Sequence, residues 1–145
     1  SPLNASRAAQ VAADLARAHG RDIVIIPAGV AHNPSRRSSE DWYGAAFIAR
    51  KIAGTVAAPC QEAFAGLTAG IDEEGLPSLF RRSDHGRFLI NLGFEEDVNY
   101  CATADVSSVV PIVAKSLLLP SGAFAARIVR YQPSGKPTVT RDVKK

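Results

Sequence analysis

Methionine is absent from the 145 residues, and the chain begins Ser1-Pro2. Because translation starts with methionine, we expect either loss of the initiator or a chain that is a fragment or one product of a cleaved precursor. The sequence also lacks an apolar run of roughly eighteen residues and a basic-then-apolar signal peptide. These two absences predict a protein with no membrane partner and a cytoplasmic location.

Cysteine is scarce, since the chain contains only Cys60 and Cys101. Neither has the spacing of a metal site or a neighbour that marks a nucleophile, so we expect both to be buried, reduced thiols. A glycine-rich phosphate loop, a Ser-His-Asp order and zinc-site spacing are missing as well. The sequence therefore gives no support to a P-loop enzyme, a serine hydrolase or a zinc enzyme.

Positive charge has little excess outside the C-terminal end. The formal charge of +3 equals that of the last ten residues, which contain Lys136, Arg141, Asp142, Lys144 and Lys145. Such a basic end is more often a solvated tail than a nucleic-acid arm, and the length and 46% hydrophobic content fit one globular domain. We therefore predict a domain at residues 1–132, a flexible basic tail at residues 133–145 and no nucleic-acid partner.

A strand, a loop and a helix are predicted in the first third of the chain. Ile23–Ile26 is a β-branched run that is apolar on both faces, which predicts a strand covered by helices on either side. A polar loop follows to Ser39, and apolar residues then recur at helical spacing until Gly54. Ser38 and Asp41 have the spacing of a capping box at the start of this helix.

The loop and the first helical turn contain the best candidates for chemistry. Ligands of open α/β sheets bind at the carboxyl ends of strands, where the loop with His32 and Arg36 and the turn with Glu40 and Asp41 must lie. Arg36 can clamp a phosphate with two hydrogen bonds, a carboxylate can hold a metal ion, and His32 or an acid can serve the leaving oxygen. The neighbouring Arg37 could be a solvated residue, and the pattern alone favours a capping role for Glu40.

The remaining elements follow from caps, stops and periodicity. Helices are predicted at Asn4–Gly20, Pro59–Gly70 and Asp84–Gly93, with another from Glu95, and an acidic turn is predicted at Ile71–Gly75. Strands are predicted at Val106–Val113 and Phe124–Tyr131.

Three short motifs, in order along the chain, resemble one protein family. They are Asn4-Ala5-Ser6, then Pro27-Ala28-Gly29 with Arg36, Glu40-Asp41 and Gly44-Ala45-Ala46, then Gly93-Phe94, Asp97-Val98, Asp105 and Val110-Pro111. This pattern, from Asn4 to about Val113, resembles the 2-phosphosulfolactate phosphatase (ComB-like) family. The resemblance implies a three-layer α/β/α sandwich with a mixed, mostly parallel sheet. It also implies a family segment upstream of the Asn-Ala-Ser helix.

The resemblance further implies a phosphoric monoester hydrolase that depends on Mg²⁺. Its reaction would convert 2-phosphosulfolactate to sulfolactate and phosphate, a step of the kind found in coenzyme M biosynthesis. The partners implied are a small phosphorylated or sulfonated acid, and either a homo-oligomer or an upstream segment of the same protein. The alternative is a non-catalytic or partial chain that binds an anionic metabolite or completes another chain.

Site roles are assigned with the help of this resemblance. Glu40, Asp41 and His32 are the catalytic candidates, and Arg36, Asn4 and Gly29 are the substrate-binding candidates. The metal candidates are Glu40, Asp41, Asp97 and Asp105, of which the last two rest on the resemblance only. Carboxylates at a helix N-terminus repel the phosphate that the helix dipole attracts, so a catalytic role there requires a cation between them.

Overall fold

The computed structural model describes residues 2–29, 38–53 and 60–132. The chain divides into two compact units, residues 1–108 and residues 109–145. The elements of the first unit are η1 (Pro2–Asn4), α1 (Ala5–His19), α2 (Ser39–Ala53), α3 (Cys60–Arg82), α4 (Asp84–Asn91) and α5 (Glu95–Ala102). The second contains β1 (Pro111–Leu118) and β2 (Phe124–Arg130). None of the described helices is both long and apolar enough to cross a membrane.

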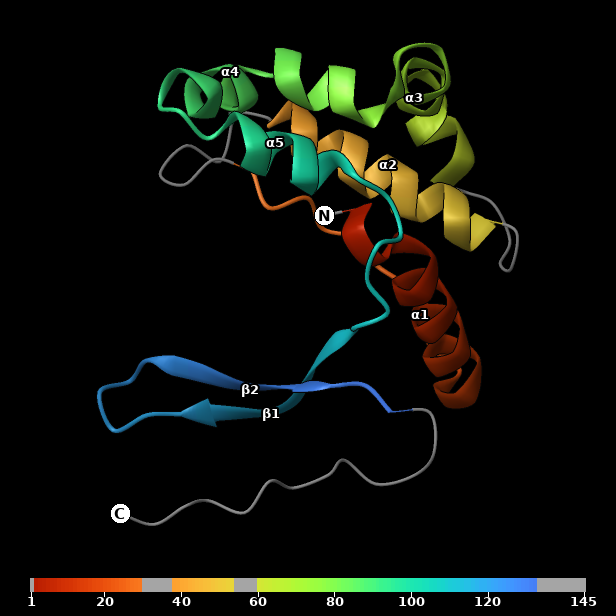
Figure 1. Cartoon of the computed structure of the whole chain (residues 1–145). Helices are drawn as coiled ribbons and strands as arrows, with labels where there is room; N and C mark the ends of the chain where they lie inside the picture. The colour runs from red at the N-terminus through yellow and green to blue at the C-terminus, as the bar shows by residue number, and fades with distance from the viewer. Residues whose placement is uncertain (1, 30–37, 54–59, 133–145) are drawn as a thin grey trace. The chain divides into compact units, whose positions relative to one another are not determined.

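The core of the first unit lies where α2, α3 and α5 meet, and α1 also packs on α2 (Figure 1). Helix α2 contributes Ala46 and Phe47, which are buried against the side chains of the other two helices. The buried side chains from α3 and α5 are Ile71, Leu76, Leu79, Phe80, Val98 and Ala102. The predicted helices at the start of the chain and before Gly54 are confirmed in α1 and α2. Helix α1 ends at Gly20, whose φ of 57° is the left-handed conformation that glycine adopts readily.

The predicted acidic turn at Ile71–Gly75 is wrong, because α3 continues through the acidic run. Residues 71–74 are helical, and Ile71 and Leu76, on either side of the acidic run, are both buried in the core. The acidic side chains find partners: Asp72 pairs with Arg50, and Glu74 lies 2.8 Å from Arg82. A kink remains at Gly75, where φ is 76°.

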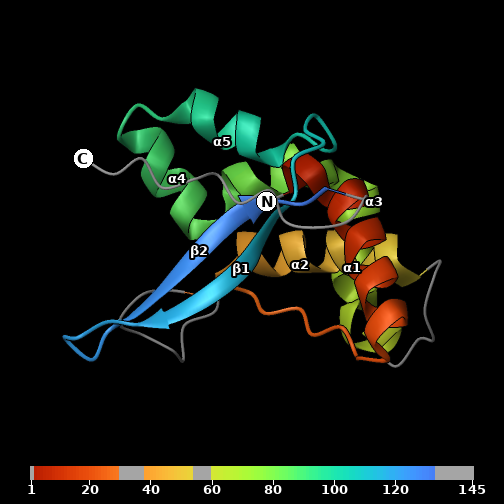
Figure 2. The ribbon, with the colours of Figure 1, turned by 90° about the horizontal axis from the view of Figure 1, so that it is seen from below.

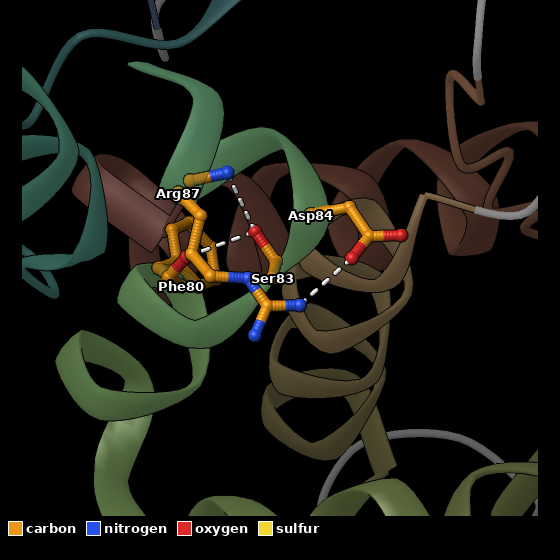
Figure 3. A network of polar contacts seen from close by, with 5 residues as sticks. Phe80, Ser83, Asp84 and Arg87 are labelled. Atoms are coloured by element: carbon orange, nitrogen blue, oxygen red, sulfur yellow. Dashed lines mark hydrogen bonds and ion pairs between the residues drawn. The ribbon is translucent and has the colours of Figure 1, made fainter. Parts of the chain in front are cut away.

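A buried serine fixes the junction between α3 and α4. The Ser83 hydroxyl donates to the Phe80 carbonyl at 2.8 Å and accepts the Gly86 amide at 2.9 Å, so it caps α4 (Figure 3). A Cβ atom at Gly86 would lie 1.9 Å from the Phe80 oxygen, so only glycine fits there. Asp84 pairs with Arg87 across the first turn at 2.9 Å. The predicted helices that begin at Asp84 and Glu95 are confirmed as α4 and α5.

The strand predicted at Ile23–Ile26 is wrong for the structure as described. Residues 21–29 run as an extended chain without strand pairing. A strand requires a neighbour that accepts and donates main-chain hydrogen bonds, and none of the described residues provides one for residues 22–28.

The second unit is an antiparallel hairpin. Its strands are joined by a turn in which Gly122 has a φ of 79° and donates to the Leu119 carbonyl at 2.9 Å. The predicted strand at Phe124–Tyr131 is confirmed as β2, whereas the strand predicted at Val106–Val113 begins later, at Pro111. The register shifts between Val113 and Lys115.

The chain is therefore of the α/β class, as predicted. Its sheet, within the described residues, is two-stranded and antiparallel, so the three-layer sandwich with a mostly parallel sheet is not found there. The domain of residues 1–132 and its tail stay a prediction.

Candidate active site at the N-terminus of α2

A cavity of about 350 Å³ lies in the first unit at the start of α2. Three kinds of wall line it: the extended segment before the loop, the first three turns of α2, and single residues from α3 and α5. The lining residues are Ile25, Ile26, Pro27, Ala28, Glu40, Asp41, Gly44, Ala45, Ile48, Phe80 and Cys101. The cavity is mostly apolar, and Glu40 and Asp41 are its charged groups.

Asp41 connects the helix to the extended segment. Its Oδ2 atom accepts a hydrogen bond from the Gly29 amide at 2.9 Å. Gly29 has a φ of 76°, a left-handed conformation that side chains with a Cβ adopt only under strain. The Pro27-Ala28-Gly29 turn and the first turn of α2, which the sequence predicts to lie at one site, are therefore in direct contact.

Glu40 is held from the other side by Ser38. The buried Ser38 hydroxyl donates to Glu40 Oε1 at 2.5 Å, and the Ser38 carbonyl accepts the Trp42 amide at 3.2 Å to begin the helix. A capping box would turn the third-position carboxylate back toward Ser38. In the described structure Asp41 bonds Gly29 instead, because that amide has turned toward the helix start.

The two carboxylates suit a hard cation. Among the described residues, each has one oxygen in a hydrogen bond and a second oxygen that can coordinate an ion. No group of three or more His, Cys, Asp or Glu suited to a metal occurs in the described parts of the chain. Mg²⁺ is nevertheless commonly held by one or two carboxylates together with substrate phosphate and water, so a pair is an adequate donor set.

Asp105 closes the start of α1. Its two carboxylate oxygens accept hydrogen bonds from the Ser6 amide and the Ser6 hydroxyl, each at 2.6 Å, and Lys51 Nζ lies at 3.6 Å. Asp105 has a φ of 57°, and its amide donates to the Pro2 carbonyl at 3.1 Å. The chain thus turns back onto the first helix and places a carboxylate at its N-terminus.

These partners shift the acidity of Asp105. Desolvation alone would raise the pKa of the carboxyl group, but the two Ser6 hydrogen bonds and the Lys51 ammonium together hold the pKa below its usual value. Sequence reasoning placed Asn4 at this cap, and Asn4 does occupy the N-cap position, but its side chain makes no capping hydrogen bond. Ser6 and Lys51 were missed as partners, although Ser6 belongs to the Asn-Ala-Ser motif.

The other predicted site residues fall in three places. Asp97 is exposed in the first turn of α5, and neither Asp97 nor Asp105 is among the described residues that line the cavity. His32 and Arg36 lie outside the described residues. The prediction of a buried thiol is wrong for Cys101, which is exposed and lines the cavity. The buried residues of α5 are Val98 and Ala102, and Cys101 does not belong to that buried face. The side chain of Cys60 lies outside the described set.

Comparison with known proteins identifies the family to which the chain belongs. The model of the 2-phosphosulpholactate phosphatase family matches residues 1–116. A match of this extent places the chain in a family of enzymes that act on phosphate esters. The chain belongs to the 2-phosphosulpholactate phosphatase family.

Two relatives support the assignment. A "Probable 2-phosphosulfolactate phosphatase" of Carboxydothermus hydrogenoformans is 35% identical over 91 residues, which are 62% of this chain and 37% of that protein. A protein of the same description from Thermosynechococcus vestitus is 46% identical over 39 residues, 27% of this chain and 16% of that one. The chain thus spans little more than a third of the first relative's length. No solved structure gives a significant match.

Proposed function

We propose that the cavity at the start of α2 is part of a Mg²⁺-dependent phosphatase site for a small phosphorylated acid. The observation that supports this proposal is the placement of Glu40 and Asp41 side by side in the wall of a mostly apolar cavity. By the names of its relatives, the substrate is 2-phosphosulfolactate, and the products are sulfolactate and phosphate. Such a reaction has its place in a coenzyme M biosynthesis-type sequence.

Phosphate ester hydrolysis requires charge neutralisation more than covalent chemistry. A phosphate monoester is a dianion at neutral pH, and the attacking water must approach in line with the leaving oxygen. Mg²⁺ held by Glu40 and Asp41 would supply the positive charge at the phosphoryl oxygens. The backbone N–H groups at the start of α2 favour the same anion once the two carboxylates are neutralised.

The chain's own residues would orient the substrate. The Gly29–Asp41 bond fixes the Pro-Ala-Gly turn beside the start of α2. In this proposal the Arg36 fork holds the phosphate or the sulfonate, and His32 or an acid protonates the leaving oxygen. The apolar side chains Ile25, Ile48 and Phe80 exclude bulk water and strengthen the electrostatic interactions inside.

A second candidate function is that of a partial chain that completes another polypeptide. The observation that favours it is the exposure of apolar side chains on the extended segment, where Val24 is 76% and Ile26 is 82% exposed. Exposed apolar side chains that lie close together are typical of an interaction surface. The two candidate functions are compatible if this chain forms the active site together with other parts of a family protein.

Mutation of Glu40 tests the proposal. Glu40→Gln retains the size and the hydrogen-bonding capacity toward Ser38 but removes the charge that would hold Mg²⁺. We expect phosphate release from 2-phosphosulfolactate to fall by orders of magnitude, with little change in thermal unfolding. Asp14→Asn, at a carboxylate of α1 that pairs with Arg17 and is not among the described residues that line the cavity, is the matched control and should keep full turnover.

Arg36 tests the substrate side of the same site. Arg36→Lys replaces a planar fork with a point charge, so we expect mainly a higher KM, with a smaller effect on kcat. An unchanged KM would remove Arg36 from the binding site. Retention of turnover and of the Mg²⁺ response in Glu40→Gln, together with lost stability, would make Glu40 a cap and move the site elsewhere.

A further inference from the structure

Gly44 lies in the interior of α2, although glycine lowers the stability of a helix interior relative to alanine. Two structural reasons commonly explain such a glycine, and neither applies here. Gly44 is not among the described glycines with a positive φ. A Cβ atom at Gly44 would have no described neighbour within 4 Å outside the backbone of its own helix, whereas at Gly86 it would lie 1.9 Å from the Phe80 oxygen. The described part of the protein therefore does not itself require glycine at position 44.

The space beside Gly44 belongs to the cavity at the start of α2. Gly44 is buried, and it lines the cavity. Gly66 of α3 also has no described neighbour within 4 Å of its Cβ position, but Gly66 is exposed, so its surroundings are bulk water. At Gly44 the bare backbone instead forms part of a cavity wall. Glycine is the usual residue where a ligand comes close to the main chain.

The cavity follows one face of α2. The lining residues of this helix recur at the spacing of a single face: Glu40, Asp41, Gly44, Ala45 and Ile48. With a rise of about 1.5 Å per residue, Gly44 lies about 5 Å along the helix axis from the two carboxylates. Figure 2 shows the extended segment before the loop (orange) running alongside α2, and residues 25–28 of this segment line the cavity as well. A ligand held at the carboxylates therefore reaches Gly44 with the atoms that follow its first charged group.

The successive turns of this helix face suit different parts of a phosphate ester. A phosphoryl group and its cation fit beside Glu40 and Asp41, as in the proposed function. Past these carboxylates, the lining residues of α2 have no polar side chain, because Gly44, Ala45 and Ile48 follow. Carbon atoms are the part of a ligand that such a wall contacts without the loss of hydrogen bonds. The bare backbone at Gly44 gives these atoms room.

We propose that Gly44 is a specificity-determining residue: the carbon skeleton of the phosphorylated acid lies against the α2 backbone at this position. The ligand class is a phosphate monoester of a short-chain hydroxy acid. Ala45 and Phe80, which are 5% and 8% exposed, belong to the close-packed interior, so the wall cannot move back to admit an added methyl group. A Cβ atom at position 44 therefore takes up space that the ligand occupies. The inference rests on the proposed function and adds the residue that limits the size of the substrate.

Substitution of Gly44 by alanine tests the proposal, in a protein that includes the rest of the family domain. Gly44→Ala adds one methyl group to the cavity and leaves Glu40 and Asp41 in place. We expect the KM for 2-phosphosulfolactate to rise by about 10-fold or more, because an added methyl group overpacks the site. The kcat should change by less than about threefold, since the interaction that is lost is made equally by the bound substrate and the transition state. Phosphate release measures both constants.

The two products of the proposed reaction separate the carbon skeleton from the phosphoryl group. Calorimetric titration with sulfolactate and with inorganic phosphate, each in the presence of Mg²⁺, measures binding without turnover. For Gly44→Ala we expect the Kd of sulfolactate to rise by about 10-fold or more and the Kd of inorganic phosphate to change by less than about twofold. An equal rise for both products would overturn the proposal, because Gly44 would then affect the phosphoryl end as well.

Thermal unfolding distinguishes this role from a structural one. Alanine is favoured over glycine in a helix interior, so Gly44→Ala should raise the melting temperature by about 1–4 °C while it weakens binding. Gly66→Ala, at the exposed glycine of α3, is the matched control and should show a similar gain in melting temperature with native KM and Kd values. A lower melting temperature for Gly44→Ala would reveal a collision of the Cβ atom within the protein and would overturn the proposal.

Failure of this inference is distinguishable from failure of the proposed function. A native protein that binds neither product and releases no phosphate would contradict the proposed function and the inference with it. Normal turnover by the native protein, together with an unchanged KM and an unchanged sulfolactate Kd in Gly44→Ala, would overturn the role of Gly44 alone. A raised KM, a raised sulfolactate Kd and a raised melting temperature in the same variant would support that role.

Discussion

At the start of α1 and again at the start of α2, an aspartate accepts a hydrogen bond from a main-chain amide. The two aspartates differ in the groups that surround the carboxylate. At α1, Asp105 is distant in sequence from the helix, accepts hydrogen bonds from Ser6 through both carboxylate oxygens and lies beside Lys51. At α2, Asp41 bonds Gly29 through one oxygen, and it shares a cavity wall with Glu40. The first carboxylate has its charge and its bonds satisfied by the protein. Each carboxylate of the second pair accepts one hydrogen bond from a described residue and lines the cavity, as the proposed Mg²⁺ site requires.

This comparison shows how an acidic helix start can be assigned to structure or to chemistry. Both carboxylates lie at a helix N-terminus, so the helix dipole does not distinguish them. The two aspartates are distinguished by the number of protein groups that bind each carboxylate and by whether the carboxylate lines a cavity. On this basis we propose that Asp105, which the family resemblance offered as a metal ligand, acts as a cap, and that the metal role belongs to Glu40 and Asp41.

The largest expected effect concerns the open site at α2. The 145-residue chain alone should show little phosphatase activity on 2-phosphosulfolactate, because other parts of a family domain should contribute to the cavity. Addition of those parts, covalently or in trans, should restore turnover. Phosphate release with and without the addition is the measurement, and full activity of the isolated chain would contradict the account.

A smaller but clear effect is expected at the closed site. Asp105→Ala removes both bonds to Ser6 and should lower the free energy of unfolding by about 1–2 kcal/mol, the usual cost of losing a helix cap. Urea unfolding of the isolated chain measures it. Asp14→Ala, which removes a surface ion pair with Arg17 on the same helix, serves as control and should cost less than about 1 kcal/mol.

The same carboxylate predicts a pH dependence. The pKa of Asp105 is lowered from its ordinary value of 3.8 in the folded chain, so its stabilising effect is fully present above that value. It should be lost as the pH falls through the lower, folded pKa. The stability difference between the native chain and Asp105→Asn should therefore shrink as the pH falls below 3.8. A difference that grows on acidification would contradict the lowered pKa.

The smallest expected effect separates capping from chemistry at α2. Ser38→Ala removes the hydroxyl that holds Glu40, and should lower stability by roughly 1 kcal/mol while turnover stays near normal where the protein is folded. Thermal unfolding and phosphate release on the same samples decide this. If turnover falls with Glu40→Gln but also with Ser38→Ala to the same extent, Ser38 positions the carboxylate rather than capping the helix.

Much of the helical fold could be predicted because its signals are local. Asp84 after a serine cap, Gly93 after α4 and the acidic start of α5 lie within a few residues of the features that they define. The acidic run in α3 was mistaken for a turn, because the buried Ile71 and Leu76 on its two sides outweigh its charge. Local composition does not show which apolar neighbours will be buried.

Long-range features could not be predicted in the same way. The contact between Ser6 and Asp105 joins residues 99 positions apart, and only the family resemblance named both. Ile23–Ile26 has the composition of a strand, but a strand also needs a partner, and no local signal says where that partner is. In the structure, the apolar side chains of Val24 and Ile26 are exposed, as expected of a strand that lacks its partner.

A paired measurement on two isosteric variants tests the central claim most directly. Glu40→Gln and Asp105→Asn each replace an acid with its amide, and each is assayed for phosphate release across a Mg²⁺ titration and for its unfolding midpoint, in a protein that includes the rest of the family domain. The account predicts that Glu40→Gln loses turnover and its Mg²⁺ response at nearly unchanged stability, while Asp105→Asn loses stability and keeps both. The reverse result, with turnover lost in Asp105→Asn and kept in Glu40→Gln, would contradict it.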